Sequence, residues 1–371
     1  MSTQEKLHWL RLARSENIGK STFFRLIDIF GSAQKALAEL SEFAASGGLK
    51  RKIKICSAED AENELINSQN FGAEIIIFSE KKYPRLLREI PDPTPILTVK
   101  GDTDFFNRDT IAIVGPRNAS FNAVTLAKKI ALELGQHSIV IASGLARGVD
   151  CAAHEASMLS GTIAVIGGGI NHIYPRENQA LYENIAKCGL LVSESPFNMT
   201  PKGGHFVQRN RLISGLSLGT VVVEAGLRSG SLTTARFSTE QGREVFSVPG
   251  SPFDPRCHGT NRLIKDGAKM FETIDDILDE LPNLRARFSD AGILREPDFE
   301  SFEAPISKMP DESEIRKIRT EIYERLNSTP TLIEEIIAEI QAPTRFVNIA
   351  LVQLELADKI VVNLGEVAIK I

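Results

Sequence analysis

From residue 110 onward, the chain repeats a pattern of a short apolar run, a turn and a helical segment. The apolar runs cover residues 110–114, 138–142, 162–166, 190–192, 220–223 and 244–248, and most of them end at glycine or small polar residues. Residues 126–134 have helical spacing, and another apolar run, 96–99, follows a proline-rich connector. Such alternation is typical of a mostly parallel sheet that helices cover on both faces. We therefore predict an α/β domain over residues 76–281, with a ligand site beyond the carboxyl ends of its strands.

Before this domain, residues 1–75 have the pattern of short helices. Gly19 is placed to make a turn and Ser21 to cap the next helix, which carries apolar residues at helical spacing. This predicts a small helical domain of the helix-hairpin-helix or SAM type. Asn17 stands where a helix-hairpin-helix turn usually has a second glycine. Two roles stay open, a phosphate-binding turn and a module that only packs.

After the α/β domain, residues 282–312 are acidic and contain four prolines, which predicts a linker. Residues 313–371 then predict helices at 314–326, 332–340 and 344–357, with Thr329 and Thr331 around Pro330 as a start signal for the second helix. A hairpin over 360–369, turning at Leu364-Gly365, completes a winged helix. Its third helix has one basic residue, Arg345, so we expect a regulatory or protein-binding role rather than DNA reading.

Charge is distributed unevenly over the 371 residues, whose net charge is −5. Residues 110–270 hold 16 basic and 11 acidic residues and are the only basic block, whereas residues 310–371 hold 7 and 11. A local positive surface on an acidic protein favours a specific anion site. The four cysteines have no metal-binding or redox spacing, and no apolar run approaches the ~18 residues of a membrane span. We expect a cytoplasmic protein with no cofactor, no metal and no membrane partner.

One segment, residues 206–219, combines an aromatic residue with a closely spaced arginine pair: Phe206, Arg209, Asn210 and Arg211. Arginine grips phosphate, asparagine positions polar edges, and a phenyl ring can stack on a base. This combination predicts a nucleic-acid or nucleotide site. Loops at strand ends add to it, namely Gly115-Pro116-Arg117, Gly167-Gly168-Gly169 and the segment from Ser143-Gly144 to Arg147.

Candidate catalytic groups are few. Asp150 and His154 lie four residues apart on one helix face, which suits acid–base work but suits structural hydrogen bonds better. Glu224 follows a strand and could act as a base or could receive an arginine. The sequence has no Walker A motif, no paired-cysteine metal site and no serine nucleophile elbow. We therefore predict a protein without catalytic activity.

Taken together, these motifs resemble those of the DNA-processing protein A (DprA/Smf) family. The match spans residues 111–270 through the segments 113–117, 143–154, 162–167, 174–175, 193–194, 206–216, 223–225, 229–232, 242–246 and 248–251. The resemblance implies a Rossmann-like fold that binds single-stranded DNA and loads the RecA recombinase onto it during natural transformation. It also implies a homodimer, which we place at the 239–271 edge, with Phe246, Leu263 and Ile264 as apolar surface.

The resemblance also implies roles for individual residues. Arg117, Arg176, which follows Tyr174-Pro175, and Lys202 correspond to phosphate contacts, and Phe206 corresponds to the residue that stacks on a base. Two departures from the family pattern are Pro116 and the pair Gly203-Gly204. The predicted DNA-binding set is Gly115, Arg117, Ser143, Gly144, Arg147, Gly168, Arg176, Lys202, Phe206, Arg209, Asn210 and Arg211. The predicted supporting set is Asp150, His154, Glu194, Glu224, Ser229, Gly230 and Ser231.

Two other functions compete with this one. Rossmann-like proteins of the lysine-decarboxylase type hydrolyse nucleoside monophosphates with an arginine and a glutamate, but this chain lacks their Pro-Gly-Gly-x-Gly-Thr signature. A pure adaptor without DNA contact would leave the basic block without a role.

Overall fold

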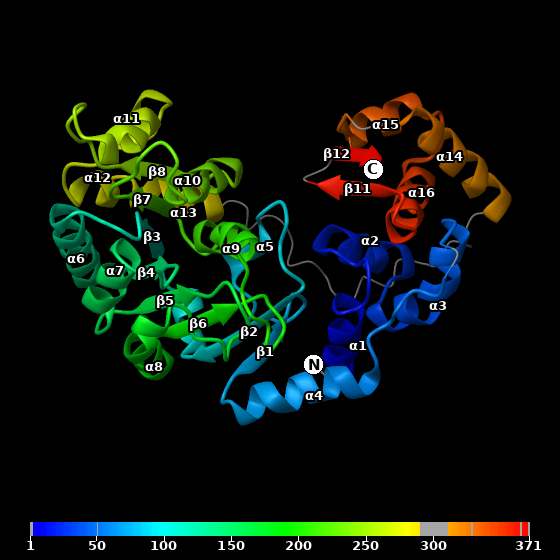
Figure 1. Cartoon of the computed structure of the whole chain (residues 1–371), viewed down its shortest axis with the longest axis horizontal. Helices are drawn as coiled ribbons and strands as arrows, with labels where there is room; N and C mark the ends of the chain where they lie inside the picture. The colour runs from blue at the N-terminus through cyan, green and yellow to red at the C-terminus, as the bar shows by residue number, and fades with distance from the viewer. Residues whose placement is uncertain (1–2, 50, 290–310, 328, 364–365, 370–371) are drawn as a thin grey trace. The chain divides into compact units, whose positions relative to one another are not determined.

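The structure is a computed structural model that describes residues 3–49, 51–289, 311–327, 329–363 and 366–369 (Figure 1). The chain forms two compact units. One comprises Ile66–Pro93 and Leu97–Arg295, and the other comprises Met1–Leu65, Thr94–Ile96 and Glu296–Ile371. The second unit therefore joins segments from the two ends of the chain, which the sequence had assigned to separate domains.

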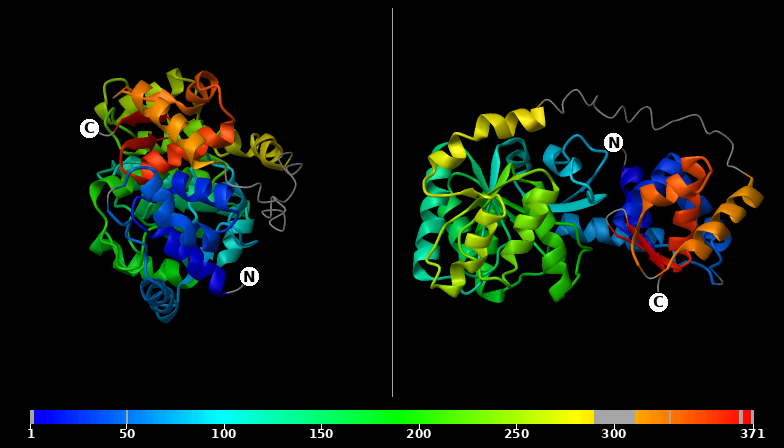
Figure 2. Two further views of the ribbon diagram at one scale, coloured as in Figure 1. Left: turned by 90° about the vertical axis from the view of Figure 1, so that its right-hand side faces the viewer. Right: turned by 90° about the horizontal axis from the view of Figure 1, so that it is seen from above.

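A nine-stranded sheet forms the centre of the first unit (Figures 1 and 2). Its strand order is β1-β2-β6-β5-β4-β3-β7-β8-β9. Strands β3 to β9 pair in parallel, whereas β2 runs antiparallel to β6. This confirms the predicted mostly parallel sheet. The strands are β1 Glu74–Ile77, β2 Ile96–Gly101, β3 Thr110–Val114, β4 Val140–Ser143, β5 Thr162–Val165, β6 Leu190–Ser193, β7 Gly219–Val222, β8 Glu244–Ser247 and β9 Lys269–Met270.

Helices cover both faces of this sheet because alternate strand residues are apolar on each side. One face packs against α6, α7 and α8, and the other packs against α9 and α10 (Figure 1). The α-helices are α5 Arg85–Arg88, α6 Phe121–Gln136, α7 Val149–Ser157, α8 Gln179–Cys188, α9 Gly203–Gly215, α10 Ser231–Glu240, α11 His258–Lys265, α12 Asp275–Leu278 and α13 Leu281–Ser289. Short 3-10 helices lie at Thr103–Asn107, Arg176–Asn178 and Pro255–Cys257.

Two predictions about the end of this domain need correction. The predicted linker begins inside α13, because Leu281 and Leu284 are buried in the core; residues 290–310 lie outside the described residues. Phe246 is fully buried in the same core, so it is not surface for a dimer at the 239–271 edge.

The second unit contains two groups of helices and a small sheet. The N-terminal helices are α1 Thr3–Ala13, α2 Lys20–Phe30 and α3 Ala33–Ser46, and α4 Ala58–Asn70 leads into the first unit. Ser21 lies inside α2 and does not cap it; the N-cap is Gly19. Asn17 has a left-handed backbone (φ 56°), which asparagine adopts more readily than most residues, so it can stand in for the missing glycine.

The C-terminal segment has the predicted winged-helix elements. They are α14 Glu312–Arg325, β10 Thr331–Leu332, α15 Ile333–Glu339, α16 Thr344–Leu356, β11 Ile360–Asn363 and β12 Glu366–Ile369. The strands form one sheet in the order β10-β12-β11. Leu332 occupies the N-cap of α15 without a side-chain hydrogen bond, so Thr329 and Thr331 do not cap that helix. The predicted turn at 364–365 lies outside the described residues.

Candidate functional site

The candidate site lies where the order of the strands reverses. Moving outward from β3, strands β4, β5 and β6 follow on one side, and β7, β8 and β9 follow on the other. Loops that leave the carboxyl ends of adjacent parallel strands at such a point diverge, and this leaves a crevice in which ligands bind. Two adjoining pockets occupy this edge, with volumes of about 410 and 740 Å³.

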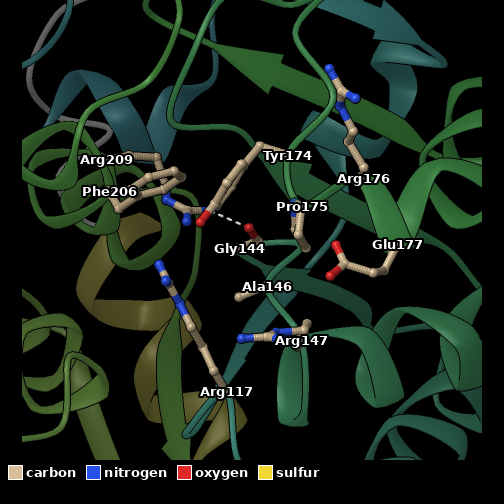
Figure 3. Close-up of a pocket in the computed structure, with 10 residues that line it drawn as sticks. All are labelled: Arg117, Gly144, Ala146, Arg147, Tyr174, Pro175, Arg176, Glu177, Phe206 and Arg209. Carbon is tan, nitrogen blue, oxygen red and sulfur yellow. Dashed lines mark hydrogen bonds between the residues drawn. The ribbon is translucent and has the colours of Figure 1, made fainter.

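The pockets share a group of aromatic and basic side chains. Figure 3 shows the smaller one, whose lining comes from the loops after β3, β4 and β5 and from α9. Its lining residues are Arg117, Gly144, Ala146, Arg147, Tyr174, Pro175, Arg176, Glu177, Phe206 and Arg209. The larger pocket is also lined by Gly115 and Asn210. It reaches the start of α10, where Ser229, Gly230 and Ser231 line it. Sequence motifs that are far apart therefore meet in one cavity.

Phe206 lies on the first turns of α9 and is half-buried. Its ring centroid lies 5.0 Å from that of Tyr174, with an angle of 37° between the planes. The guanidinium carbon of Arg117 lies 5.3 Å from the centroid of the Phe206 ring, within cation–π range. Gly167 supports the ring from behind, since a Cβ there would come within 2.8 Å of it. An aromatic surface is thus held open to the pocket beside a cation.

Arg209 is a buried cation that links α9 to the ends of β4 and β5. Its side chain is buried, and it donates hydrogen bonds to the carbonyl of Gly144, at 2.7 Å, and to that of Val165. Burial lowers the pKa of Arg209 to about 10, against the opposing charge of Asp150, so Arg209 remains cationic near neutral pH. The guanidinium therefore ties α9 to the ends of β4 and β5, and its charge still reaches both pockets.

Four cations around these pockets are exposed: Arg117, Arg147, Arg176 and Lys202. Within the described residues, none of the four side chains makes a hydrogen bond or an ion pair with the protein. Arg117, Arg147 and Arg176 line the smaller pocket, although Figure 3 shows the guanidinium of Arg176 directed away from the other two. Lys202 precedes α9, between two residues of the larger pocket, Pro201 and Gly203. Their charges are available to an anionic ligand.

Arg211, by contrast, is not a surface cation. Its side chain is only 2% exposed, and its Nε lies 3.0 Å from Asp92 Oδ2. A second ion pair joins it to Glu194. Arg211 lines neither pocket, so the structure favours the alternative of a buried partner of Glu194 over the predicted DNA contact.

Three other predicted contacts are also buried. The Ser143 hydroxyl donates to the Ile113 carbonyl at 2.6 Å, and the carbonyl of Gly144 is used by Arg209. Gly168 packs against Pro201, because a Cβ at Gly168 would come within 2.7 Å of the Pro201 ring. The glycines after β5 thus make room for neighbouring protein segments rather than for a ligand. Ser143 and Gly168 support the loops and lie outside the lining of both pockets.

The supporting residues are largely committed to hydrogen bonds. Glu224 is buried and accepts from the hydroxyl of Ser120 at 2.6 Å and from its N–H at 3.2 Å, at the start of α6. Asp150 is buried beside Arg209 and accepts from the N–H of Ala146, while burial raises its pKa.

His154 does not pair with Asp150. Its Nδ1 lies 2.7 Å from the Thr162 hydroxyl, and burial lowers its pKa to about 3, so it is neutral at physiological pH. Ser229 and Ser231 bond each other through their hydroxyls at 2.8 Å, and the side chain of Asn210 donates to the Gly230 carbonyl. These contacts indicate structural roles for the predicted supporting set.

Tyr174 and Glu177 line the smaller pocket but are not among the predicted site residues. The sequence points to Tyr174 only as part of the Tyr174-Pro175 motif, although its ring lies beside that of Phe206. Glu177 is an exposed carboxylate whose side chain turns toward the pocket in Figure 3, and its position directly after Arg176 was a signal for it.

No group of three or more metal-binding side chains occurs within the described residues. None of the helices in the described part of the chain is long and apolar enough to cross a membrane. The loop after β3 has Gly115-Pro116-Arg117 in place of the glycine-rich dinucleotide fingerprint. The arrangement suits an extended anion with aromatic surfaces better than a metal or a dinucleotide.

Comparison with known proteins supports this picture. Residues 74–282 match the family model of DNA recombination-mediator protein A, residues 3–66 match a DprA-like N-terminal HHH domain, and residues 307–364 match the DprA winged helix domain. The chain is 44% identical over 222 residues to DNA processing protein DprA of Bacillus subtilis, covering 59% of this chain and 75% of that one. It is 35% identical over 299 residues to Protein Smf of Synechocystis, covering 76% and 74%.

Solved structures agree with the sequence matches. DNA processing protein A from Streptococcus pneumoniae superposes with a TM-score of 0.63 at 31% identity, covering 76% of this chain and 98% of that one. The Helicobacter pylori DNA processing protein A, whose structure concerns its single-stranded DNA binding mode, gives 0.53 at 30% identity, covering 57% and 96%. None of these relatives is described by a catalytic activity. From its match to all three domain models and from these relatives, the chain belongs to the DNA recombination-mediator protein A (DprA/Smf) family.

Proposed function

We propose that this chain binds single-stranded DNA in the two adjoining pockets and loads RecA onto that DNA, as a homodimer without catalytic activity. The observation that carries the proposal is the group of exposed cations near the Phe206–Tyr174 pair, which make no hydrogen bond or ion pair within the described residues. Exposed cations hold phosphates without sequence preference, and an aromatic face accepts any unpaired base. Bases in a duplex are stacked on each other, so only a single strand can use both features.

The family relationship supports the same function. The Helicobacter pylori relative is described by its binding of single-stranded DNA, and the matching family model is that of a recombination mediator. Loading of RecA and dimerisation rest on this relationship. Glu224, the candidate base of a hydrolase, is buried and occupied by Ser120, which favours a binding role over catalysis.

The central test compares a labelled oligothymidine with a duplex of equal length by fluorescence anisotropy. We expect the single strand to bind at least about tenfold more tightly, about 1.4 kcal/mol. Phe206→Ala should weaken single-strand binding by ~1–3 kcal/mol, the usual worth of a base–aromatic stack. Gly204→Ala is the control on the same helix, since no atom lies within 4 Å of the added Cβ. Equal affinity for both DNAs, with no loss in Phe206→Ala, would contradict the proposal.

The partner claims need separate tests. RecA assembly on single-stranded DNA, followed through its DNA-dependent ATP hydrolysis, should start earlier when the chain is present. Sedimentation should show a dimer. Incubation with nucleoside monophosphates should release no free base; release would favour the hydrolase.

A further inference from the structure

The third helix of the winged helix, α16, is buried on more than one side. Eight of its 13 residues are buried: Val347, Ile349, Ala350, Leu351, Val352, Gln353, Leu354 and Leu356. It packs on α14 within the winged helix and on α2 and α3 of the N-terminal helices (Figure 1). A helix that reads DNA in a helix-turn-helix protein needs an exposed face whose side chains reach the base edges. The N-terminal helices cover a large part of α16 instead.

Polar contacts fix this packing at the carboxyl end of α16. The Asn17 side chain donates a hydrogen bond to the carbonyl of Leu356 at 3.2 Å. Arg25 on α2 and Glu355 on α16 attract each other and are both largely buried, and burial raises the pKa of Glu355. A buried charge is costly without an opposite partner. Each of these two contacts links a residue of the N-terminal segment to a residue of α16 that lies more than 300 positions later in the sequence.

The closest backbone approach is at Gly47, directly after α3. A Cβ at this position would lie 2.0 Å from the carbonyl oxygen of Gln353 in α16. Gly47 has a right-handed helical backbone (φ −66°), so its own conformation does not require glycine. The glycine is required by the approach of α16, which indicates that the α2–α3 surface is shaped for that helix.

We propose that the winged helix is a protein-binding module whose ligand is the N-terminal helical module of its own chain. The α2–α3 surface is the binding site, and α16 is the helix that it binds. The contact also engages the side chain of Asn17, which begins the turn that a helix-hairpin-helix module would offer to phosphate, whereas Gly19 of that turn stays exposed. The winged helix does not then read DNA through α16, and the two modules act as one body. Charge agrees, since residues 310–371 hold 11 acidic and 7 basic residues and Arg345 is the one basic residue of α16.

The test uses the full chain and hydrogen exchange read by mass spectrometry. Gly47→Ala places a methyl group against the Gln353 backbone, so amide exchange in residues 344–356 and 20–46 should rise at least about tenfold, about 1.4 kcal/mol. Exchange in residues 110–193 should stay at the wild-type rate. Gly19→Ala is the matched control, because its added Cβ meets only Thr22 Oγ1, at 3.9 Å. Wild-type exchange of 344–356 in Gly47→Ala would overturn the proposal.

A second variant keeps the test decisive if Gly47→Ala folds poorly. Asn17→Gly preserves the left-handed backbone but removes the donor to Leu356, so exchange at the end of α16 should rise about fivefold. No change there would count against the proposal. Duplex affinity is the second readout: a loss in Arg345→Ala with unchanged exchange would show that α16 reads DNA and would overturn it.

Discussion

Two arginines, Arg117 in the loop after β3 and Arg211 on α9, allow a sharp test of the site, because the structure gives them opposite roles. Arg117 is exposed, stacks over Phe206 and has no ion pair within the described residues. Arg211 is buried between Asp92 and Glu194. Arg211→Ala leaves two carboxylates without their cation and should lower the free energy of unfolding by about 3–5 kcal/mol. Arg117→Ala should change it by no more than about 0.5 kcal/mol.

The salt dependence of binding should show the reverse. Each phosphate contact to a single strand adds roughly 0.7 to the slope of log K against log salt. Contacts from Arg117, Arg147, Arg176 and Lys202 would give a slope of about −2.8, so affinity should fall about 50-fold between about 50 and 200 mM salt. In Arg117→Ala the slope should be about −2.1 and the fall about 18-fold. In folded Arg211→Ala the slope should remain that of the wild type.

Urea unfolding and anisotropy titrations at four salt concentrations, on the same preparations, measure both quantities. Lys265→Ala is the charge-matched control, since Lys265 is exposed on α11 and lines neither pocket. An unchanged slope in Arg117→Ala would refute the phosphate role. A flattened slope in Arg211→Ala without loss of stability would refute the buried-pair assignment.

Three further predictions follow from single contacts. Gly167→Ala should weaken single-strand binding about fivefold at unchanged salt slope, because its Cβ would lie 2.8 Å from the Phe206 ring; unchanged affinity in anisotropy would argue against stacking. Glu177→Gln should strengthen binding, since it removes an exposed carboxylate from a site for an anion; weaker binding would instead show that Glu177 contacts a base. The depressed pKa of His154, about 3, means that its neutral form is favoured by folding, so this stabilisation is present above pH 6.5 and is lost as the pH falls toward 3. Between pH 7 and 5, urea unfolding should show the wild type losing about 2 kcal/mol more than His154→Gln, and parallel curves would contradict this.

Most strands of the central sheet were predictable because they are short apolar runs that end at glycine or small polar residues. β1, Glu74–Ile77, was not predicted. β9 has two residues, Lys269 and Met270, and such a short strand has no apolar run to reveal it. The start of the predicted linker was wrong for a related reason. Acidic composition dominates residues 282–312, whereas the fold of 281–289 depends on Leu281 and Leu284 reaching a core built from distant strands.

Within the site, the types of residue were predictable but their burial was not. Arg209 and Arg211 are identical residues two positions apart in one segment, and no local signal separates them from a surface cation. Arg211 is buried because Asp92, 119 residues away, and Glu194 meet it in the folded chain. Phe206 was predictable because an aromatic residue beside arginines has few uses other than stacking on a ligand or packing in a core.

The distribution of carboxylates explains how an acidic protein presents a site for a polyanion. Near the pockets, Glu224 is occupied by Ser120, Glu194 by Arg211, and Asp150 lies beside Arg209. Each of these carboxylates is largely withdrawn from solvent, so its field at the surface is offset by a neighbouring donor or cation. Glu177 is the exposed carboxylate in the lining of the smaller pocket, which also includes the exposed cations Arg117, Arg147 and Arg176. The site is therefore positive because its buried carboxylates are offset by neighbouring donors or cations, while its exposed arginines have no such partner within the described residues. The net charge of −5 does not oppose this local potential.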